Sequence, residues 1–155
     1  MLDDLDIENL CNGYSCVMHG DYILDNILKT QDSFKLLDWR QDFGGNIYLG
    51  DIYYDLGKLN HNLTFNHNIV NKGLYKIENN ENIIIDILTS FNLNNCKNIL
   101  KQFCESNNFD FNKVEIISSI IWLNMSPLHS YPLNLFLFYF GKYNLYKQLK
   151  AITHD

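Results

Sequence analysis

The sequence contains little proline and little positive charge. Of its 155 residues, two are proline and eight are glycine, which excludes a collagen-like chain or a proline-rich linker. Eleven lysines and the single arginine, Arg40, are outnumbered by 18 acidic residues, and the net charge is −6 at pH 7. The basic residues do not cluster, so we expect no nucleic-acid partner.

Long apolar runs are also missing. The stretches Ile116–Leu123 and Leu135–Phe140 are interrupted by serine or end at glycine, well short of the roughly 20 residues that a membrane-spanning helix needs. The sequence does not open with a basic segment followed by an apolar one, which is the pattern of a secretion signal. We therefore expect a cytoplasmic protein without a membrane partner.

Cysteine is present, but not in a metal-binding pattern. Cys11, Cys16, Cys96 and Cys104 form no C-x-x-C pair, so we expect reduced thiols rather than a zinc site. Hydrophobic residues make up 46% of the chain and charged residues 19%, which is typical of a folded globular protein. The length predicts a single domain over residues 1–155.

Short strands are predicted in the first third of the chain. They are Tyr14–Met18, Ile27–Lys29 and Phe34–Leu37. Turn-forming residues 30–33 lie between the last two segments, which predicts a hairpin. Leu2, Leu5 and Leu10 recur near helical spacing, so we expect a helix before the first strand.

Helices are predicted for most of the remaining chain. Asp51 is expected to cap a helix that runs to about Asn62. Toward the C-terminus apolar residues repeat with helical spacing, and Pro127 and Pro132 separate the last two helices. The segment Tyr75–Leu88 fits either a hairpin or a strand that enters a helix. The expected fold class is α+β, mainly helical, with a small β-hairpin that carries two functional loops.

Polar residues that suit phosphoryl transfer follow the predicted strands. Residues 19–26 read H-G-D-x-x-x-x-N, from His19 through Asp21 to Asn26, and Asp38 stands at the end of the next hairpin strand. In this chemistry one carboxylate orients the attacking hydroxyl and accepts its proton. A second carboxylate and an amide oxygen hold the magnesium that bridges the nucleotide phosphates. Both loops leave the same end of a two-stranded ribbon, so we expect these side chains on one rim.

This pattern resembles the family of aminoglycoside phosphotransferases and choline kinases, which are relatives of the protein kinases. Leu37–Trp39 is similar to its metal motif, and Gly50–Leu56 is similar to a third motif, G-D-x-x-x-D-L. The resemblance implies that Asp21 is the catalytic base and that Asn26 and Asp38 bind Mg²⁺. It also implies a co-substrate, which is ATP or another nucleoside triphosphate, and a small-molecule acceptor.

The same resemblance implies a fold and two supporting residues. The fold would be the C-terminal lobe of a protein-kinase-like enzyme. His19 would support the catalytic loop, and Asp55 would accept hydrogen bonds from the loop backbone at the start of a helix. The ordered match from His19 through Asp55 makes a chance similarity the weaker interpretation.

Part of the sequence resembles more closely the branch found with bacterial capsule and lipopolysaccharide biosynthesis genes. The similar segments are Asp38–Gly44, Gly50–Leu59 and, less specifically, Trp122–His129. This resemblance implies a kinase that acts on a hydroxyl of a sugar or an amino alcohol in surface-polysaccharide biosynthesis.

Several neighbouring residues have two interpretations. Arg40 could contact an anionic substrate group or phosphate, or it could form a structural ion pair with a nearby carboxylate. Asp25 is expected to be a polar loop residue rather than part of the metal site. His129 could line the acceptor pocket, although we favour a histidine that lies between two helices with its hydrogen bonds made there. Core positions are expected for four aromatic residues: Trp122, Tyr139, Tyr143 and Tyr146.

A kinase-like enzyme also needs a lobe with a glycine-rich loop over the phosphates. Only thirteen residues precede Tyr14, and no G-x-G-x-x-G occurs, so the chain is expected to correspond to the C-terminal lobe alone. Three explanations then compete: a gene fragment, one half of a split kinase that needs a partner lobe, and a non-catalytic interaction module. A homo-oligomer or a separate lobe is the protein partner expected. The sequence leaves open whether the lobe alone is an active enzyme.

Overall fold

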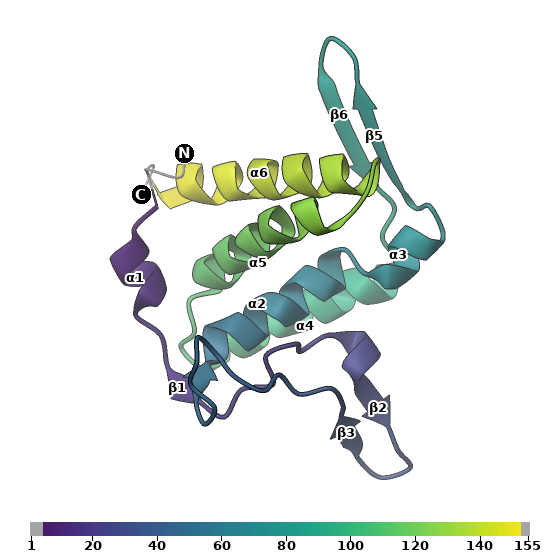
Figure 1. The fold of residues 1–155 in the computed structure, drawn as a ribbon. Helices are drawn as coiled ribbons and strands as arrows, with labels where there is room; N and C mark the ends of the chain where they lie inside the picture. The colour runs from purple at the N-terminus through teal and green to yellow at the C-terminus, as the bar shows by residue number, and fades with distance from the viewer. Residues whose placement is uncertain (1–4, 153–155) are drawn as a thin grey trace.

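The computed structural model describes residues 5–152 and has an α+β architecture in which helices predominate (Figure 1). The helices are α1 (Ile7–Cys11), α2 (Ile52–Thr64), α3 (His67–Asn71), α4 (Phe91–Ser106), α5 (Phe111–Met125) and α6 (Leu133–Ile152), with short 3₁₀ helices η1 (Leu24–Asn26) and η2 (Ser126–Leu128). The strands are β1 (Ser15–Cys16), β2 (Ile27–Lys29), β3 (Phe34–Leu36), β4 (Gly50–Asp51), β5 (Tyr75–Asn79) and β6 (Ile83–Ile87).

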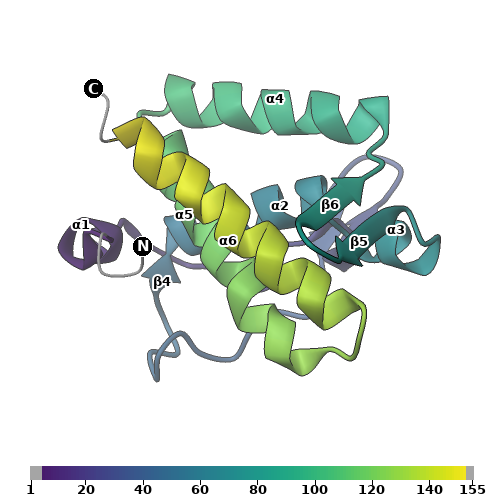
Figure 2. The same ribbon diagram turned by 90° about the horizontal axis from the view of Figure 1, so that it is seen from above.

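The core lies where four helices meet. Helix α5 packs against both α6 and α2, and α2 also packs against α4. Figure 1 shows the hairpin β5–β6 projecting beyond α6, with β2–β3 at the opposite end, and Figure 2 shows α4 along one side of the molecule. One buried cluster joins α2, α4 and α5 through Tyr53, Leu56, Leu63, Leu100, Cys104 and Val114. A second joins the residue that follows α2 to α3, α5 and α6, through Phe65, Ile69, Trp122, Phe136, Leu137 and Phe140.

Helices α2 and α5 approach closely because small and polar residues form their contact. A Cβ atom on Gly57 would lie 2.5 Å from the Cγ2 atom of Ile117, so a larger residue would push the helices apart. The amide of Asn60 donates to the hydroxyl of Ser118 at 2.8 Å. That hydroxyl also contacts the carbonyl oxygens of Gly57 and Val114, at 3.0 and 2.8 Å. The position of α2 in the bundle, and of the residues that it carries, is therefore firmly specified.

Most of the predicted elements are confirmed. β2 pairs antiparallel with β3, with Ile27 opposite Leu36, and the Tyr75–Leu88 segment is the hairpin β5–β6. The carboxylate of Asp51 accepts a hydrogen bond from the N–H of Tyr53 at 3.0 Å and caps α2, as predicted. The helix expected before the first strand is α1, and Leu2 lies outside the described residues. Helix α3 and the β1–β4 pairing were not predicted.

The prediction that four aromatic residues lie in the core is wrong for two of them. Trp122 is buried, but the exposed fractions of Tyr143 and Tyr146 are 54% and 46%. The reason is that α6 buries a single face, which consists of Phe136, Leu137, Phe140, Gly141 and Leu145. Helical spacing alone does not say which side of a helix faces a neighbour. No helix among residues 5–152 is both long and apolar enough to cross a membrane.

Candidate functional site

The loops with the predicted phosphoryl-transfer residues meet beside the first turns of α2. Residues 19–26 precede β2, and residues 37–40 follow β3. The N–H of Leu37 donates to the carbonyl oxygen of Asn26, and the N–H of Arg40 donates to that of His19, both at 2.9 Å. Two loops that are separate in sequence are thus joined by backbone hydrogen bonds on either side of Asp38.

Asp55, in the first turn of α2, holds the backbone of the first loop. Its Oδ2 atom accepts a hydrogen bond from the N–H of His19 at 2.6 Å, and its Oδ1 atom accepts one from the N–H of Gly20 at 2.8 Å. Gly20 has a φ of +80°, and a Cβ atom there would lie 2.5 Å from the Cβ of Arg40, so only glycine fits. The contact that the family resemblance implies for Asp55 is present.

His19 links the two loops through its ring. Its side chain is buried, with an exposed fraction of 2%. Nδ1 accepts a hydrogen bond from the N–H of Asp21 at 3.2 Å, so the ring proton lies on Nε2, which donates to the carbonyl oxygen of Leu37 at 2.7 Å. The ring also lies 4.9 Å from the ring of Trp39. Both ring nitrogens are therefore occupied by structural hydrogen bonds.

The carboxylate of Asp21 is held by a lysine and an amide. The ammonium of Lys58, in α2, lies 2.6 Å from Oδ1, and the Asn26 amide donates to Oδ2 at 3.1 Å. Burial alone would raise the pKa of Asp21, but the hydrogen bond and charge of Lys58, the Asn26 amide and the Arg40 charge together lower it. Asp21 is therefore a carboxylate at neutral pH, and its side chain keeps 32% exposure.

Asn26 and Asp38 supply oxygen atoms that suit magnesium. The amide nitrogen of Asn26 donates to the backbone and side-chain oxygens of Asp21, so Oδ1 is the Asn26 side-chain atom that could bind a cation. Asp38 is exposed and has a φ of +57°, a conformation that aspartate adopts more readily than most residues. Groups of three or more His, Cys, Asp or Glu side chains that could hold a metal are absent from the described residues. Two protein ligands still fit Mg²⁺, which takes its other ligands from water and phosphate.

Two polar neighbours of the site have local partners. Arg40 donates from Nη1 to the hydroxyl of Tyr54 at 3.2 Å, and its guanidinium lies 5.6 Å from the centre of that ring. Within residues 5–152 it forms no ion pair, so the structural ion pair considered from the sequence is not found. The Oδ2 atom of Asp25 lies 3.2 Å from Nδ1 of His67, and Asp25 is an exposed loop residue, as expected.

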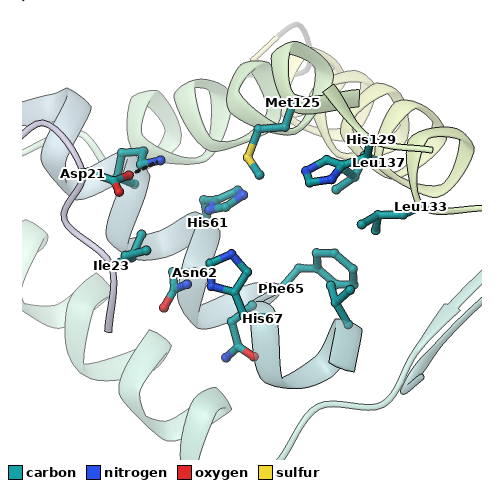
Figure 3. Close-up of a pocket in the computed structure, with 13 residues that line it drawn as sticks. Asp21, Ile23, His61, Asn62, Phe65, His67, Met125, His129, Leu133 and Leu137 are labelled. Atoms are coloured by element: carbon teal, nitrogen blue, oxygen red, sulfur yellow. Dashed lines mark ion pairs between the residues drawn. The ribbon is translucent and has the colours of Figure 1, made fainter. Parts of the chain in front are cut away.

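A cavity of about 330 Å³ opens beside Asp21 (Figure 3). Its polar lining comes from Asp21, Lys58, His61, Asn62, Asn66, His67 and His129. Its apolar lining comes from Ile23, Phe65, Val70, Met125, Leu133 and Leu137. His129 is exposed and lines this cavity, which corrects the favoured expectation of a histidine satisfied between helices. The turn that follows η2 lies at the cavity rather than inside the helix contact.

His61 is the most unusual residue of the cavity wall. It is buried, with an exposed fraction of 5%, and neither Nδ1 nor Nε2 has a hydrogen-bond partner among residues 5–152. Burial, assisted by the charge of Lys58, lowers its pKa from 6.5 to about 3, against a smaller opposite effect of Asp21. The ring of Trp122 lies 5.6 Å from the imidazole. At neutral pH His61 is therefore an uncharged ring with one donor and one acceptor unused.

Sequence motifs predict no role for four residues of this site: Lys58, His61, Asn62 and His67. Three of them lie in α2, and Asn62 Oδ1 accepts a hydrogen bond from the N–H of Leu24 at 3.0 Å. The signal was present, because positions 55, 58 and 62 follow each other at helical spacing and share one face. His67 lies in α3, which the sequence did not predict.

Comparison with known proteins does not assign the chain to a family. No protein-family model matches the chain, and no curated protein or solved structure matches it either.

Proposed function

We propose that this chain is a kinase-like C-terminal lobe that transfers the γ-phosphoryl group of ATP, or of another nucleoside triphosphate, to a hydroxyl of a small molecule. The resemblance to the aminoglycoside phosphotransferase and choline kinase family supplies the reaction class. The branch linked to capsule and lipopolysaccharide biosynthesis favours a sugar or an amino alcohol as the acceptor.

One observation carries the proposal: Asp21 lies on the wall of a small-molecule-sized cavity while its loop is joined to the loop of Asp38. The cavity volume of about 330 Å³ lies in the range of roughly 300–1,000 Å³ usual for small-molecule sites. The hydrogen bonds from Leu37 to Asn26 and from Arg40 to His19 hold the two loops together. An acceptor beside Asp21 and phosphates beside Asp38 would therefore be neighbours.

The chemistry requires a carboxylate at the position of Asp21. The acceptor oxygen attacks the γ-phosphorus, the bond from that phosphorus to the bridging oxygen breaks, and the nucleoside diphosphate leaves. Asp21 orients the hydroxyl and accepts its proton. The lowered pKa of Asp21 keeps it ionised at neutral pH. Lys58 and Asn26 fix its two oxygens, so the base is already oriented before substrate binds.

Asn26 Oδ1 and the carboxylate of Asp38 are the atoms that would hold Mg²⁺. The cation would supply charge neutralisation for the nucleotide phosphates. His19 and Asp55 would be positioning residues: they would hold the loop that carries Asp21 in place through the hydrogen bonds described above. Arg40 is exposed at the same rim and would be available to a phosphate or another anionic group.

The direct test is phosphoryl transfer from Mg·ATP to a panel of sugars and amino alcohols, followed by ³¹P NMR. Asp21→Asn should lower turnover by about 10²–10⁴-fold, the usual loss when a general base is removed, while nucleotide binding persists. Asp25→Asn, which changes an exposed carboxylate in the same loop, is the matched control and should keep its activity. Equal turnover in the Asp21→Asn and Asp25→Asn variants would refute the assignment.

An interaction module, or one half of a split kinase, is the second candidate. An apolar groove of about 600 Å³ runs between α4 and the site loops. Its exposed walls include Leu24, Trp39, Ile99 and Phe103, with exposed fractions between 41% and 55%. Exposed apolar surface of this kind is typical of a contact with another chain.

Sedimentation velocity separates this candidate from an enzyme that acts alone. The partner hypothesis predicts self-association that Trp39→Ser together with Phe103→Ser abolishes. A monomer at all concentrations that catalyses phosphoryl transfer would exclude the interaction module.

A further inference from the structure

We propose that the cavity beside Asp21 binds an uncharged polyhydroxy acceptor, a sugar, and that a hydroxyl group of this sugar hydrogen-bonds to the imidazole of His61. This inference rests on the proposed phosphotransferase function, because it assigns the acceptor of that same site. Sugars and amino alcohols both carry the required hydroxyl, and the cavity wall distinguishes between them.

The charges around the cavity disfavour a cation. Asp21 is the single carboxylate among the lining residues, and both of its oxygens already have partners, Lys58 and Asn26. An ammonium group in the cavity would therefore lie near the Lys58 ammonium, with no unpaired carboxylate in the cavity lining to compensate it. Phe65 is the one phenylalanine, tyrosine or tryptophan of the lining, whereas quaternary ammonium sites use several aromatic faces.

His61 supplies a hydrogen-bonding group that has no partner in the described part of the chain. Its exposed fraction is 5%, and both ring nitrogens are buried without a hydrogen bond to any of residues 5–152. Leaving a buried polar atom unpaired is costly, so a partner that is not part of the folded chain is expected. Figure 3 shows the rings of His61, His67 and His129 around one space, with the Met125 side chain above them. The neutral ring, whose pKa is about 3, offers one donor and one acceptor, as a hydroxyl does.

The rest of the wall suits a sugar ring. Apolar side chains such as Phe65, Leu133 and Leu137 can cover the C–H surface of a pyranose, while Asn62, His67 and His129 offer polar atoms at its edge. Trp122, in α5, packs against His61 with 5.6 Å between the ring centres, which leaves the imidazole in a closely packed position. A residue held in this way favours ligands with a hydroxyl opposite it and disfavours those without one.

Binding measured without nucleotide or magnesium tests the inference separately from the phosphotransferase function. The probes are a panel of neutral monosaccharides including N-acetylglucosamine, its ammonium counterpart glucosamine, and choline. Calorimetry should show that at least one neutral sugar binds, and that glucosamine and choline bind more weakly by about tenfold or more. The ¹⁵N signals of the His61 imidazole should shift when the sugar binds, a response that a purely structural histidine would not give.

Two substitutions at the same position complete the test. His61→Leu removes both hydrogen-bonding atoms and should weaken sugar binding by about tenfold. His61→Gln keeps a donor and an acceptor and should stay within about threefold of the unsubstituted chain. Thermal unfolding of both variants shows whether they fold.

The outcomes have separate meanings. Tighter binding of choline or glucosamine, unchanged sugar binding in folded His61→Leu, or no binding of any neutral sugar would overturn the inference. If a neutral sugar binds through His61 but Mg·ATP transfers no phosphoryl group to it, the sugar assignment stands and the proposed function fails. Transfer to choline alone would leave the phosphotransferase function standing and overturn the sugar assignment.

Discussion

Helix α6 and the segment that carries the site loops are built in different ways. In α6, Phe136, Leu137 and Leu145 have exposed fractions of at most 1%. In the segment 14–49, by contrast, only His19, Gly20 and Ile23 are buried. Ten of its large apolar side chains are exposed: Tyr14, Val17, Leu24, Leu28, Phe34, Leu37, Trp39, Ile47, Tyr48 and Leu49.

The difference shows that burial stabilises the bundle, whereas polar contacts to one helix shape the site. Asp55, Lys58 and Asn62 of α2 hold the loop residues His19, Gly20, Asp21 and Leu24. Substitutions in the two regions should therefore have separable effects. Substitutions of core residues should lower the stability of the fold. Substitutions of Asp55, Lys58 or Asn62 should loosen the site loops while the bundle stays folded.

The largest effect on stability is expected in α6. Phe136→Ala removes a fully buried ring and should lower the free energy of unfolding by about 3–5 kcal/mol. Phe138→Ala, two residues along the same helix and 41% exposed, should cost under about 1 kcal/mol. Urea unfolding followed by circular dichroism measures both. Similar losses for the two variants would contradict the one-sided burial of α6.

Asp55→Asn should loosen the site loop more than the bundle. It replaces a charged acceptor of two backbone hydrogen bonds, and each bond to a charged group contributes about 1.5–3 kcal/mol. We expect the interaction between Asp55 and the loop to weaken by about 1.5–3 kcal/mol in total, because the asparagine side chain keeps one acceptor oxygen. Amide hydrogen exchange should accelerate at His19 and Gly20 while protection in α5 and α6 is kept. Uniform acceleration across the chain would show that the loop and the bundle are not separable.

His61 should make the stability of the bundle depend on pH. The unfolded chain protonates this ring below about pH 6.5, but the folded chain keeps it neutral down to about pH 3. The stability that comes from keeping His61 neutral is therefore fully present above pH 6.5 and is lost as the pH falls toward 3. Between pH 7.5 and 5 the loss should be about 2 kcal/mol. In the folded His61→Leu variant the free energy of unfolding should lack this part of its pH dependence. An unchanged pH dependence would contradict a buried, neutral His61 ring.

Lys58→Met should produce the smallest change in stability and a clear change in titration. Burial raises the pKa of Asp21, and Lys58 is the main group that lowers it, so the pKa should rise in the variant. Ionised Asp21 stabilises the fold at pH values above the pKa that it has in the unfolded chain. This stabilisation is lost as the pH falls through the pKa of Asp21 in the folded chain. In Lys58→Met this loss should begin at higher pH. Carboxylate ¹³C NMR measures the shift, and Lys35→Met, an exposed substitution, should leave it unchanged.

The sequence predicted the elements better than the contacts between them. The hairpin Ile27–Leu36 and the Asp51 cap are local features, and turn and cap residues close to them in sequence predict them. The bond from Asp55 to the loop backbone came from a family resemblance, not from local pattern. The cavity could not be predicted, because it combines α2, α3, the turn after η2 and α6. For His61 the sequence shows only a polar residue in a helix, and its burial depends on Trp122, which is distant in sequence.

We propose that Asn26 and Asp38 form one cation site beside Asp21. The most direct measurement is the broadening of backbone amide NMR signals by Mn²⁺ in the presence of ATP, since Mn²⁺ takes the same oxygen ligands as Mg²⁺. We predict that the broadening is centred on residues around Asn26 and Asp38, that Asp38→Asn removes it, and that Asp32→Asn, in the exposed hairpin turn, does not. Broadening that is centred elsewhere, or that survives Asp38→Asn unchanged, would contradict the account.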